Sequence, residues 1–330
     1  MNIRSVTLLA LMPAFVVPLR SAEPEALRQV QTIPLPDVEG RIDHLSVDID
    51  GRRLFVSALG NNTLEVIDLR EGKRLTSVTG LREPQGVFFV PKENKLFVAN
   101  GDEGTCRIFD GSSYKLIATV HFPSDADNVR YDAAENQIYV GYGKGALGVL
   151  DATSGRKIAD IALAAHPESF RLEEPGSRIF VNLPNANHTI AVVDRAKRSV
   201  IATWPLEAAA NFPMTLDQAD HRVLVVTRKP ARLLVLDSES GKQVASYPSV
   251  GDADDVFYDA THKRVYISGG EGFIDVFDQH DSDHYSLAAK VATAAGARTS
   301  LFVPELNRFF LAVPHRGSQK AEVRVYDAGP

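Results

Sequence analysis

The chain has few of the residues on which several protein classes depend. It contains one cysteine, Cys106, so it can form no internal disulfide, and its stability must come from a large apolar core. Cys106 lies in the alternating segment TCRIFD, where we expect a small buried hydrophobic residue. There is no run of basic residues and the formal net charge is −6 at pH 7, so no nucleic-acid partner is expected. No window sustains a 3.6-residue apolar period, which excludes a helical repeat.

The first 22 residues have the features of a secretory signal peptide. Arg4 supplies a positive charge, residues 6–19 are almost all apolar, and the small residues Ser21 and Ala22 follow. An uncleaved membrane anchor is the alternative, but the apolar run is shorter than the roughly 20 residues that a spanning helix needs. We therefore expect residues 1–22 to be cleaved, no membrane span in the mature protein, and a periplasmic or secreted location.

A repeat of about 42 residues runs through the rest of the chain. It contains the segments RLFVS, KLFVA, QIYVG, RIFVN, RVLVV, RVYIS and RFFLA. The third apolar residue of each serves below as a marker, and the seven markers are Val56, Val98, Val140, Val181, Val225, Ile267 and Leu311. After each marker comes another strand that ends in aspartate, and these residues are Asp68, Asp110, Asp151, Asp194, Asp237, Asp278 and Asp327. Short alternating strands at regular spacing, with turn residues between them, predict an all-β repeat.

About four strands in a unit of this length is the size of a propeller blade. The sequence therefore predicts an all-β, seven-bladed β-propeller with four-stranded antiparallel blades, formed by residues 23–330 as a single domain. The seventh unit lacks its outer strand, and residues 27–35 resemble the outer strands of other units. We expect these residues to complete the last blade, which pairs an exposed sheet edge.

The segment RLFVSALGNNTLEVIDLREGK, residues 53–73, resembles the repeat of YVTN-type, or YncE-like, β-propellers of exported bacterial proteins. The resemblance extends over essentially the whole mature chain. The chain has one tryptophan, Trp204, and no Trp-Asp pair, so it resembles neither WD-repeat proteins nor quinoprotein dehydrogenases. The resemblance implies the fold and export, whereas function must be argued from a site because propellers have many functions.

The markers align the seven innermost strands without any homologue. Thirteen residues before them the chain has Asp43, Gln85, Asp127, Glu168, Phe212, Asp254 and Arg298. Fifteen residues before them it has Arg41, Glu83, Asp125, His166, Ala210, Asp252 and Gly296. Since residues i and i+2 share a face of a strand, we expect both sets at one mouth of the central channel. Asp48, Asp132, Asp217 and Asp259 share a turn position instead, and we expect them, like the strand-ending aspartates, to bind their own backbone.

The predicted ligand site at this mouth comprises fourteen residues, namely Asp43, His44, Gln85, Asp125, Asp127, Asn128, His166, Glu168, Asn211, Asp252, Asp254, Asp255, Arg298 and Thr299. Clustered carboxylates raise one another's pKa or require a cation. A solvated rim of a wet channel is the structural alternative.

Two functions fit such a mouth. One is non-enzymatic binding of a small ligand, a cation or a cationic segment of a protein partner, by a monomer with a rigid scaffold. The other is a metal-dependent hydrolase or lactonase, with a divalent ion held by Asp127, Glu168, Asp254 and His44. Oxygen ligands would suit Ca or Mg, and histidine would admit Zn or Mn. No H-E-x-x-H or G-x-S-x-G motif occurs, so no catalytic residue can be assigned.

Overall fold

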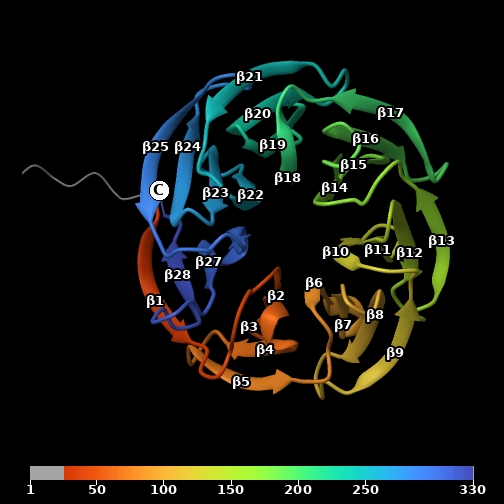
Figure 1. Cartoon of the computed structure of the whole chain (residues 1–330), viewed down its shortest axis with the longest axis vertical. Coiled ribbons are helices and arrows are strands. Elements are labelled where there is room, and N and C mark those ends of the chain that lie inside the picture. Colours follow the sequence, from red (N-terminus) through yellow and green to blue (C-terminus); the bar gives the residue numbers. More distant parts are fainter. Residues whose placement is uncertain (1–25, 330) are drawn as a thin grey trace, which may run out of the picture.

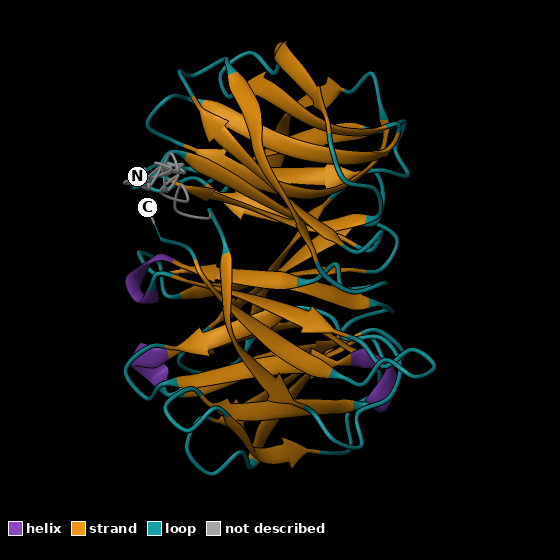
Figure 2. Ribbon diagram, turned by 90° about the vertical axis from the view of Figure 1, so that its left-hand side faces the viewer, coloured by secondary structure: helices purple, strands orange, loops and turns teal. Residues whose placement is uncertain are grey.

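The computed structural model describes residues 26–329, which form a ring of β-sheets. In this range 28 strands form seven four-stranded antiparallel sheets, arranged around a central axis as the blades of a propeller (Figure 1). Figure 2 shows the same ring from the side. The expected signal peptide, residues 1–22, lies outside the described residues. Among residues 26–329 no helix is long and apolar enough to cross a membrane.

The strands occupy equivalent positions in the seven blades. The innermost strands are β2 (Leu45–Asp48), β6 (Pro84–Val90), β10 (Ala126–Asp132), β14 (Phe170–Leu172), β18 (Ala209–Asp217), β22 (Ala253–Asp259) and β26 (Ser300–Val303). The second strands are β3 (Arg53–Ala58), β7 (Lys95–Asn100), β11 (Gln137–Tyr142), β15 (Arg178–Leu183), β19 (Arg222–Lys229), β23 (Arg264–Gly269) and β27 (Arg308–Val313).

The outer half of each blade has two further strands. The third strands are β4 (Thr63–Asp68), β8 (Thr105–Asp110), β12 (Ala146–Asp151), β16 (Thr189–Asp194), β20 (Ala231–Asp237), β24 (Phe273–Gln279) and β28 (Glu322–Asp327). The outermost strands are β5 (Lys73–Val78), β9 (Leu116–His121), β13 (Lys157–Ala162), β17 (Ser199–Pro205), β21 (Gln243–Pro248), β25 (Tyr285–Ala292) and β1 (Arg28–Pro34). Three short 3-10 turns are η1 (Leu59–Asn61), η2 (Pro91–Glu93) and η3 (Pro304–Leu306).

The first and second strands pair in the same register in every blade. Each marker residue lies opposite the residue eleven positions before it, in the pairs Leu45–Val56, Val87–Val98, Val129–Val140, Phe170–Val181, Met214–Val225, Val256–Ile267 and Ser300–Leu311. The seven-bladed fold is therefore confirmed, and residues at one repeat position lie at equivalent places around the axis.

The N-terminal strand closes the ring. β1 pairs antiparallel with β28, from Arg28 opposite Asp327 to Pro34 opposite Glu322. In Figure 1 the red β1 lies beside the blue β28, so the chain's two ends share one blade. The expectation for residues 27–35 is confirmed, with the strand one residue shorter at each end. This pairing removes a sheet edge that would otherwise be exposed.

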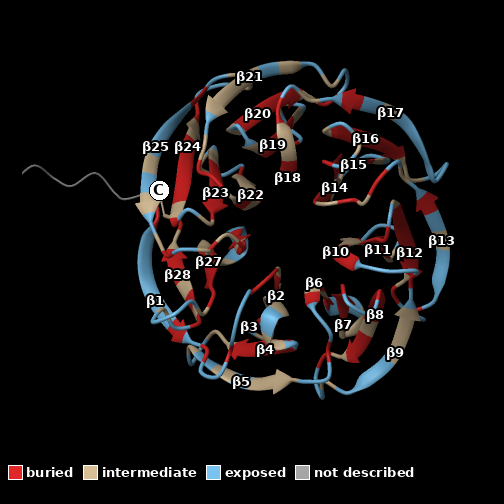
Figure 3. Cartoon of the chain, viewed as in Figure 1, coloured by how far each residue is buried: buried red, intermediate tan, exposed pale blue. Residues whose placement is uncertain are grey.

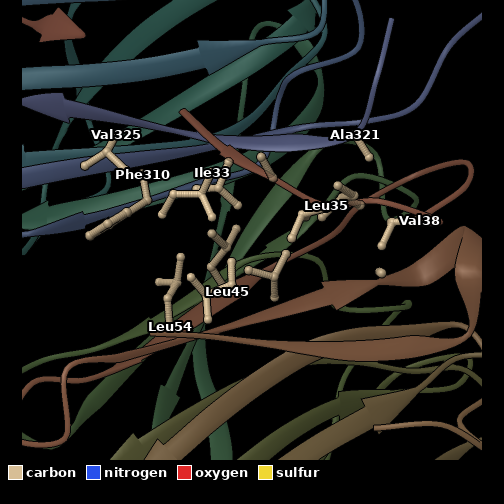
Figure 4. Close-up of a cluster of buried hydrophobic side chains, with 14 of the residues drawn as sticks. Ile33, Leu35, Val38, Leu45, Leu54, Phe310, Ala321 and Val325 are labelled. Carbon is tan, nitrogen blue, oxygen red and sulfur yellow. The ribbon is translucent and has the colours of Figure 1, made fainter. Parts of the chain in front are cut away.

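The core lies between blades. Seven clusters of buried apolar side chains each combine residues of two neighbouring blades. At the closure, Ile33 and Leu35 pack with Phe310 of the last blade and Leu54 of the first (Figure 4). The outermost strands consist mostly of exposed and partly buried residues, whereas the middle strands are largely buried (Figure 3). Cys106 is fully buried in one of these clusters, as its sequence context predicts.

The repeated aspartates hold turns, with two exceptions. Gly51 N donates to Oδ1 of Asp48 over 3.0 Å, and Asp132, Asp217 and Asp259 accept equivalent backbone bonds. Five strand-ending aspartates do the same, and these are Asp68, Asp110, Asp151, Asp194 and Asp237. Asp278 and Asp327 instead pair with Arg264 and Arg308, so the turn assignment was wrong for these two.

Candidate functional site

The chain enters the inner strands through a distorted backbone. Five residues at the position fifteen before the marker have left-handed φ angles, and they are Glu83 (49°), Asp125 (39°), Ala210 (59°), Asp252 (53°) and Gly296 (78°). A register shift follows at the start of β6, β10, β18 and β22. Such bulges redirect side chains, so simple strand alternation does not decide what faces the axis here. The side chain of Asp125 is 52% exposed, but that of Asp127 only 10%.

A cavity of about 590 Å³ opens at this end of the inner strands, and we call it the mouth cavity. Nine of the fourteen expected site residues line it, and these are Asp43, His44, Gln85, Asp125, Asp127, His166, Glu168, Asp254 and Arg298. They come from six different blades. The repeat register therefore gathers polar side chains that are up to 255 positions apart in the sequence, Asp43 and Arg298 being the extremes.

On one side of the mouth cavity two arginines share two aspartates. Arg228 donates to Oδ1 of Asp254 over 2.6 Å and lies 3.3 Å from Oδ1 of Asp252. Arg298 contacts Oδ2 of Asp254 at 3.0 Å and binds both oxygens of Asp252 at 2.9 and 3.0 Å. The guanidinium of Arg228 also lies 3.9 Å from the centroid of the Phe212 ring. Burial raises the pKa of Asp254 to about 6, against the opposing charge of Arg228.

A second group surrounds His44. Its Nε2 lies 3.6 Å from Asp43, and its Nδ1 lies 3.6 Å from Asp255. Arg41 donates to the other oxygen of Asp43 over 2.8 Å. Burial lowers the pKa of His44, but the carboxylates of Asp255 and Asp43 outweigh it and raise this pKa to about 10. The imidazole is therefore protonated at neutral pH.

A third group surrounds His166. Nδ1 donates to the carbonyl oxygen of Gly143 over 2.6 Å, and the ring lies 3.7 Å from both Asp125 and Asp127. Gln85 donates to Oδ1 of Asp125 over 3.1 Å. Burial lowers the pKa of His166, but its contacts with Asp127 and Gly143 raise that pKa to about 9. This histidine is also protonated at neutral pH.

Glu168 differs from the other carboxyl groups of the mouth cavity. Within residues 26–329 its side chain has no ion pair and no hydrogen bond, whereas Asp43, Asp125, Asp127 and Asp254 each face a cationic side chain within 4 Å. Burial raises the pKa of Glu168 to about 8, and the charge of Asp127 adds to this shift. Glu168 therefore keeps its proton at neutral pH.

Five expected site residues do not line the mouth cavity. Asn211 is fully buried and donates to Oδ1 of Asn182 and to the carbonyl of Thr189, so it links strands rather than facing the axis. The hydroxyl of Thr299 donates to the carbonyl of Ile42, and Asn128 lies buried against Asp127. Asp252 accepts hydrogen bonds from Arg298, and Asp255 lines a separate cavity.

Eight residues outside the predicted site line the mouth cavity, and these are Arg41, Gly143, Lys144, Ala164, Ala165, Asn185, Phe212 and Arg228. Arg228 had a signal in the sequence, because it stands three residues after its marker. At that position the other blades have Leu59, Gly101, Gly143, Pro184, Gly270 and Pro314. This repeat position lies at the mouth cavity because the second strand of each blade runs antiparallel to the first, and so ends where the first strand begins. A long cationic side chain among glycines and prolines marks blade five as unusual.

The four expected metal ligands line one cavity but are not arranged as a metal site. Within the described part of the chain, no three His, Cys, Asp or Glu side chains are grouped so that they could hold a metal ion. Asp254 faces Arg228 and Arg298, and His44 lies between two aspartates. The metal set of Asp127, Glu168, Asp254 and His44 is therefore not supported, because cationic side chains already pair with most of these carboxylates.

Comparison with known proteins agrees with the repeat. No family model matches the chain. A stretch of 120 residues is 24% identical to the uncharacterized protein YncE of Salmonella typhimurium, and it covers 36% of this chain and 34% of that protein. The chain resembles YncE-like β-propellers. The match thus spans about a third of the length of this YncE protein.

A solved structure shows the same ring. A chain of Kuenenia stuttgartiensis hydrazine synthase superimposes with a TM-score of 0.74 at 17% identity. The superposition covers 84% of this chain and 94% of that chain. At this identity the likeness shows the fold alone, and function must come from the residues of the mouth cavity.

Proposed function

We propose that the protein is an exported, non-enzymatic binding protein that takes a small organic cation, such as an amine, in the mouth cavity beside Glu168. One observation carries this proposal. Within residues 26–329, Glu168 is the one carboxyl group lining the cavity that no cationic side chain pairs with. A ligand ammonium group supplies the missing partner.

The protonation of Glu168 supports a cationic ligand. Burial and the nearby charge of Asp127 raise its pKa to about 8, so the empty site holds a proton there. A neighbouring positive charge favours the ionised carboxylate. Binding of an ammonium group therefore releases this proton and forms a charge-assisted hydrogen bond, which is stronger than a neutral one.

The size of the cavity supports a small ligand. Pockets for small molecules usually have volumes of roughly 300–1,000 Å³, and the mouth cavity has about 590 Å³. Its walls are largely polar, and His166 and Asn185 come from the same blade as Glu168. These groups offer additional hydrogen bonds to an amine that carries hydroxyl or carbonyl groups.

The histidines support binding rather than catalysis. A general base must be unprotonated at the working pH and must reach the proton that it removes. The pKa of His44 is raised to about 10 and that of His166 to about 9, so both are protonated at neutral pH. Their roles are to hold Asp43, Asp255 and Asp127 in place.

Export rests on the signal-like residues 1–22 and on the resemblance to exported propellers. Fractionation of cells that produce the full chain is expected to place the protein outside the cytoplasm, with a new N-terminus after Ala22. If the protein stays in the cytoplasm and keeps residues 1–22, export is refuted. The ligand proposal does not depend on this result.

The ligand proposal is tested by calorimetry with the mature protein at pH 7. Ethanolamine, propylamine and putrescine are titrated beside uncharged analogues, in two buffers of different ionisation enthalpy. We expect at least one of the three amines to bind, with release of close to one proton, while the uncharged analogues do not bind. Glu168→Gln abolishes binding, and the control Glu71→Gln, which changes an exposed turn residue, leaves it unchanged. Absence of any amine binding, or equal binding by Glu168→Gln, contradicts the proposal.

A further inference from the structure

A second cavity, of about 170 Å³, lies farther along the inner strands, and we call it the channel cavity. Its lining includes six of the seven residues ten positions before the markers, and these six are Ser46, Phe88, Arg130, Arg171, Phe257 and Leu301. The two arginines come from β10 and β14, which are neighbours in the ring (Figure 1). The channel cavity thus contains two adjacent cationic side chains on the axis.

Within the described part of the chain these two arginines have no carboxylate partner. Among residues 26–329 neither guanidinium forms an ion pair within 4.0 Å. Arg130 donates to the carbonyl oxygens of Phe170 over 3.2 Å and Val129 over 2.8 Å. Arg171 donates from Nε to the carbonyl oxygen of Met214 over 2.9 Å. The remaining guanidinium nitrogens, Nη2 of Arg130 and both terminal nitrogens of Arg171, have no hydrogen bond to this part of the chain.

The charge of the channel cavity is strongly unbalanced. Burial, with repulsion from Arg171 adding to it, lowers the pKa of Arg130 to about 9, yet the group is still charged at neutral pH. The carboxylate that lines the cavity, Asp255, is already engaged, because it accepts a bond from Ser300 N and faces protonated His44. Buried charges are normally paired, and here the partner is missing from the described protein.

We propose that the channel cavity binds a small organic carboxylate, whose two oxygens bridge Arg130 and Arg171. Guanidinium groups match the planar carboxylate with paired hydrogen bonds. The lining also includes the apolar side chains of Phe88, Phe257 and Leu301, and the guanidinium of Arg171 lies 5.9 Å from the centroid of the Phe257 ring. Such a lining suits a short hydrocarbon chain rather than a fully polar anion. This site is distinct from the cation site at Glu168, and it takes a ligand of opposite charge.

The apolar part of the channel-cavity lining predicts how the affinity for carboxylates varies with the length of their hydrocarbon chain. Each added methylene that becomes buried increases affinity about four-fold. We expect affinity to rise from acetate through propionate and butyrate, and to fall once the chain exceeds the space of about 170 Å³. The primary amides of the same acids have the same shape without the charge, so they should bind at least ten-fold more weakly.

The mature protein is titrated with these acids and amides, and with inorganic phosphate, while melting temperature and binding heat are followed. The proposal expects carboxylates to raise the melting temperature, amides to have little effect, and phosphate to bind more weakly than butyrate. No response to any carboxylate, or phosphate binding as strong as that of butyrate, overturns it.

Variants of Arg171 separate a binding role from a structural one. Without ligand, Arg171→Met removes an unpaired, half-buried charge, so its melting temperature should equal or exceed that of the wild type. Its affinity for butyrate should fall at least ten-fold. Arg171→Lys keeps the positive charge but lacks the forked guanidinium, so it should bind butyrate several-fold more weakly than the wild type. This variant still tests the proposal if Arg171→Met folds poorly.

Arg156→Met is the control, because Arg156 is exposed on an outer turn and should leave butyrate binding unchanged. Glu168→Gln should also leave butyrate binding unchanged, so failure of the amine proposal and failure of this one are distinguishable. Unaltered butyrate affinity in Arg171→Lys together with a lower melting temperature would show that the arginine serves the fold alone.

Discussion

Nη2 of Arg228 donates a 2.6 Å hydrogen bond to Oδ1 of Asp254, and the two side chains come from neighbouring blades. Both are mostly buried, with side-chain exposures of 18% and 16%. The pair therefore links β19 of blade five to β22 of blade six at the rim of the mouth cavity. Its loss affects both the stability of the ring and the charge balance of the site.

Arg228→Met should destabilise the protein by about 2–4 kcal/mol, because removal of one partner leaves a buried carboxylate with less compensation. Arg298 remains on Asp254, which keeps the loss below that of a wholly unpaired charge. Urea unfolding gives the free energy. The control Arg82→Met breaks an exposed contact with Asp102 and should cost no more than about 0.5 kcal/mol.

The double variant Arg228→Met with Asp254→Asn completes this test. Asparagine carries no charge, so the double variant should recover part of the stability that Arg228→Met loses. If the losses of the two single variants simply add, the two side chains do not interact energetically and the pairing has no role in stability.

Glu168 should make stability depend on pH between about 4.5 and about 8. Its folded pKa, about 8, is raised from the ordinary value of 4.5, so the folded state binds the proton more strongly than the unfolded chain does. The stability of the wild type therefore falls as pH rises from about 4.5 to about 8. Glu168→Gln removes this loss, so the variant should match the wild type near pH 4 and melt at a higher temperature at pH 8.5.

Melting curves between pH 4 and pH 9 check this, with roughly 2–4 °C expected for each kcal/mol. His44 and His166 also make stability fall as pH rises. Their folded pKa values are raised from 6.5 to about 10 and about 9, so their stabilising contribution is lost as pH rises through these values. That fall remains in Glu168→Gln, so the difference between the two proteins isolates Glu168. A constant difference at all pH values would contradict the raised pKa.

Cys106 should be inert in the folded protein. It is fully buried between blades two and three, and burial raises the pKa of its thiol to about 12. Thiolates, not thiols, react with disulfide reagents. A chromogenic disulfide should therefore react with Cys106 only at the rate of unfolding, and fully in denaturant. Fast reaction under native conditions would mean that this interface opens readily.

The repeat made the fold predictable because it supplied an alignment within one chain. The markers fix the pairing of first and second strands, as Leu45 opposite Val56 and Ser300 opposite Leu311 show. The same register located the end of the channel at which Asp127 and Asp254 lie. These properties depend on local strand patterns and on seven-fold repetition, both of which are visible in the sequence.

Individual contacts at the mouth could not be predicted in the same way. A left-handed residue such as Asp125 and the bulge after it decide which side chains face the cavity, and alternation does not describe this. The pairing of Arg228 with Asp254 joins residues of different blades, whose separation depends on the packing between sheets. Asn211 has the polar character of a site residue but bonds to Asn182 within the fold.

The closure of the ring gives the last prediction. Ile33 of β1 is fully buried among Leu54 of the first blade and Phe310 and Val325 of the last, whereas Val30 on the same strand is 43% exposed. Ile33→Ala removes buried methyl and methylene groups at the seam and should cost about 2–5 kcal/mol. Val30→Ala makes a similar reduction on the solvent side and should cost no more than about 0.5 kcal/mol. Equal unfolding free energies for the two variants in urea would show that β1 does not contribute to closing the ring.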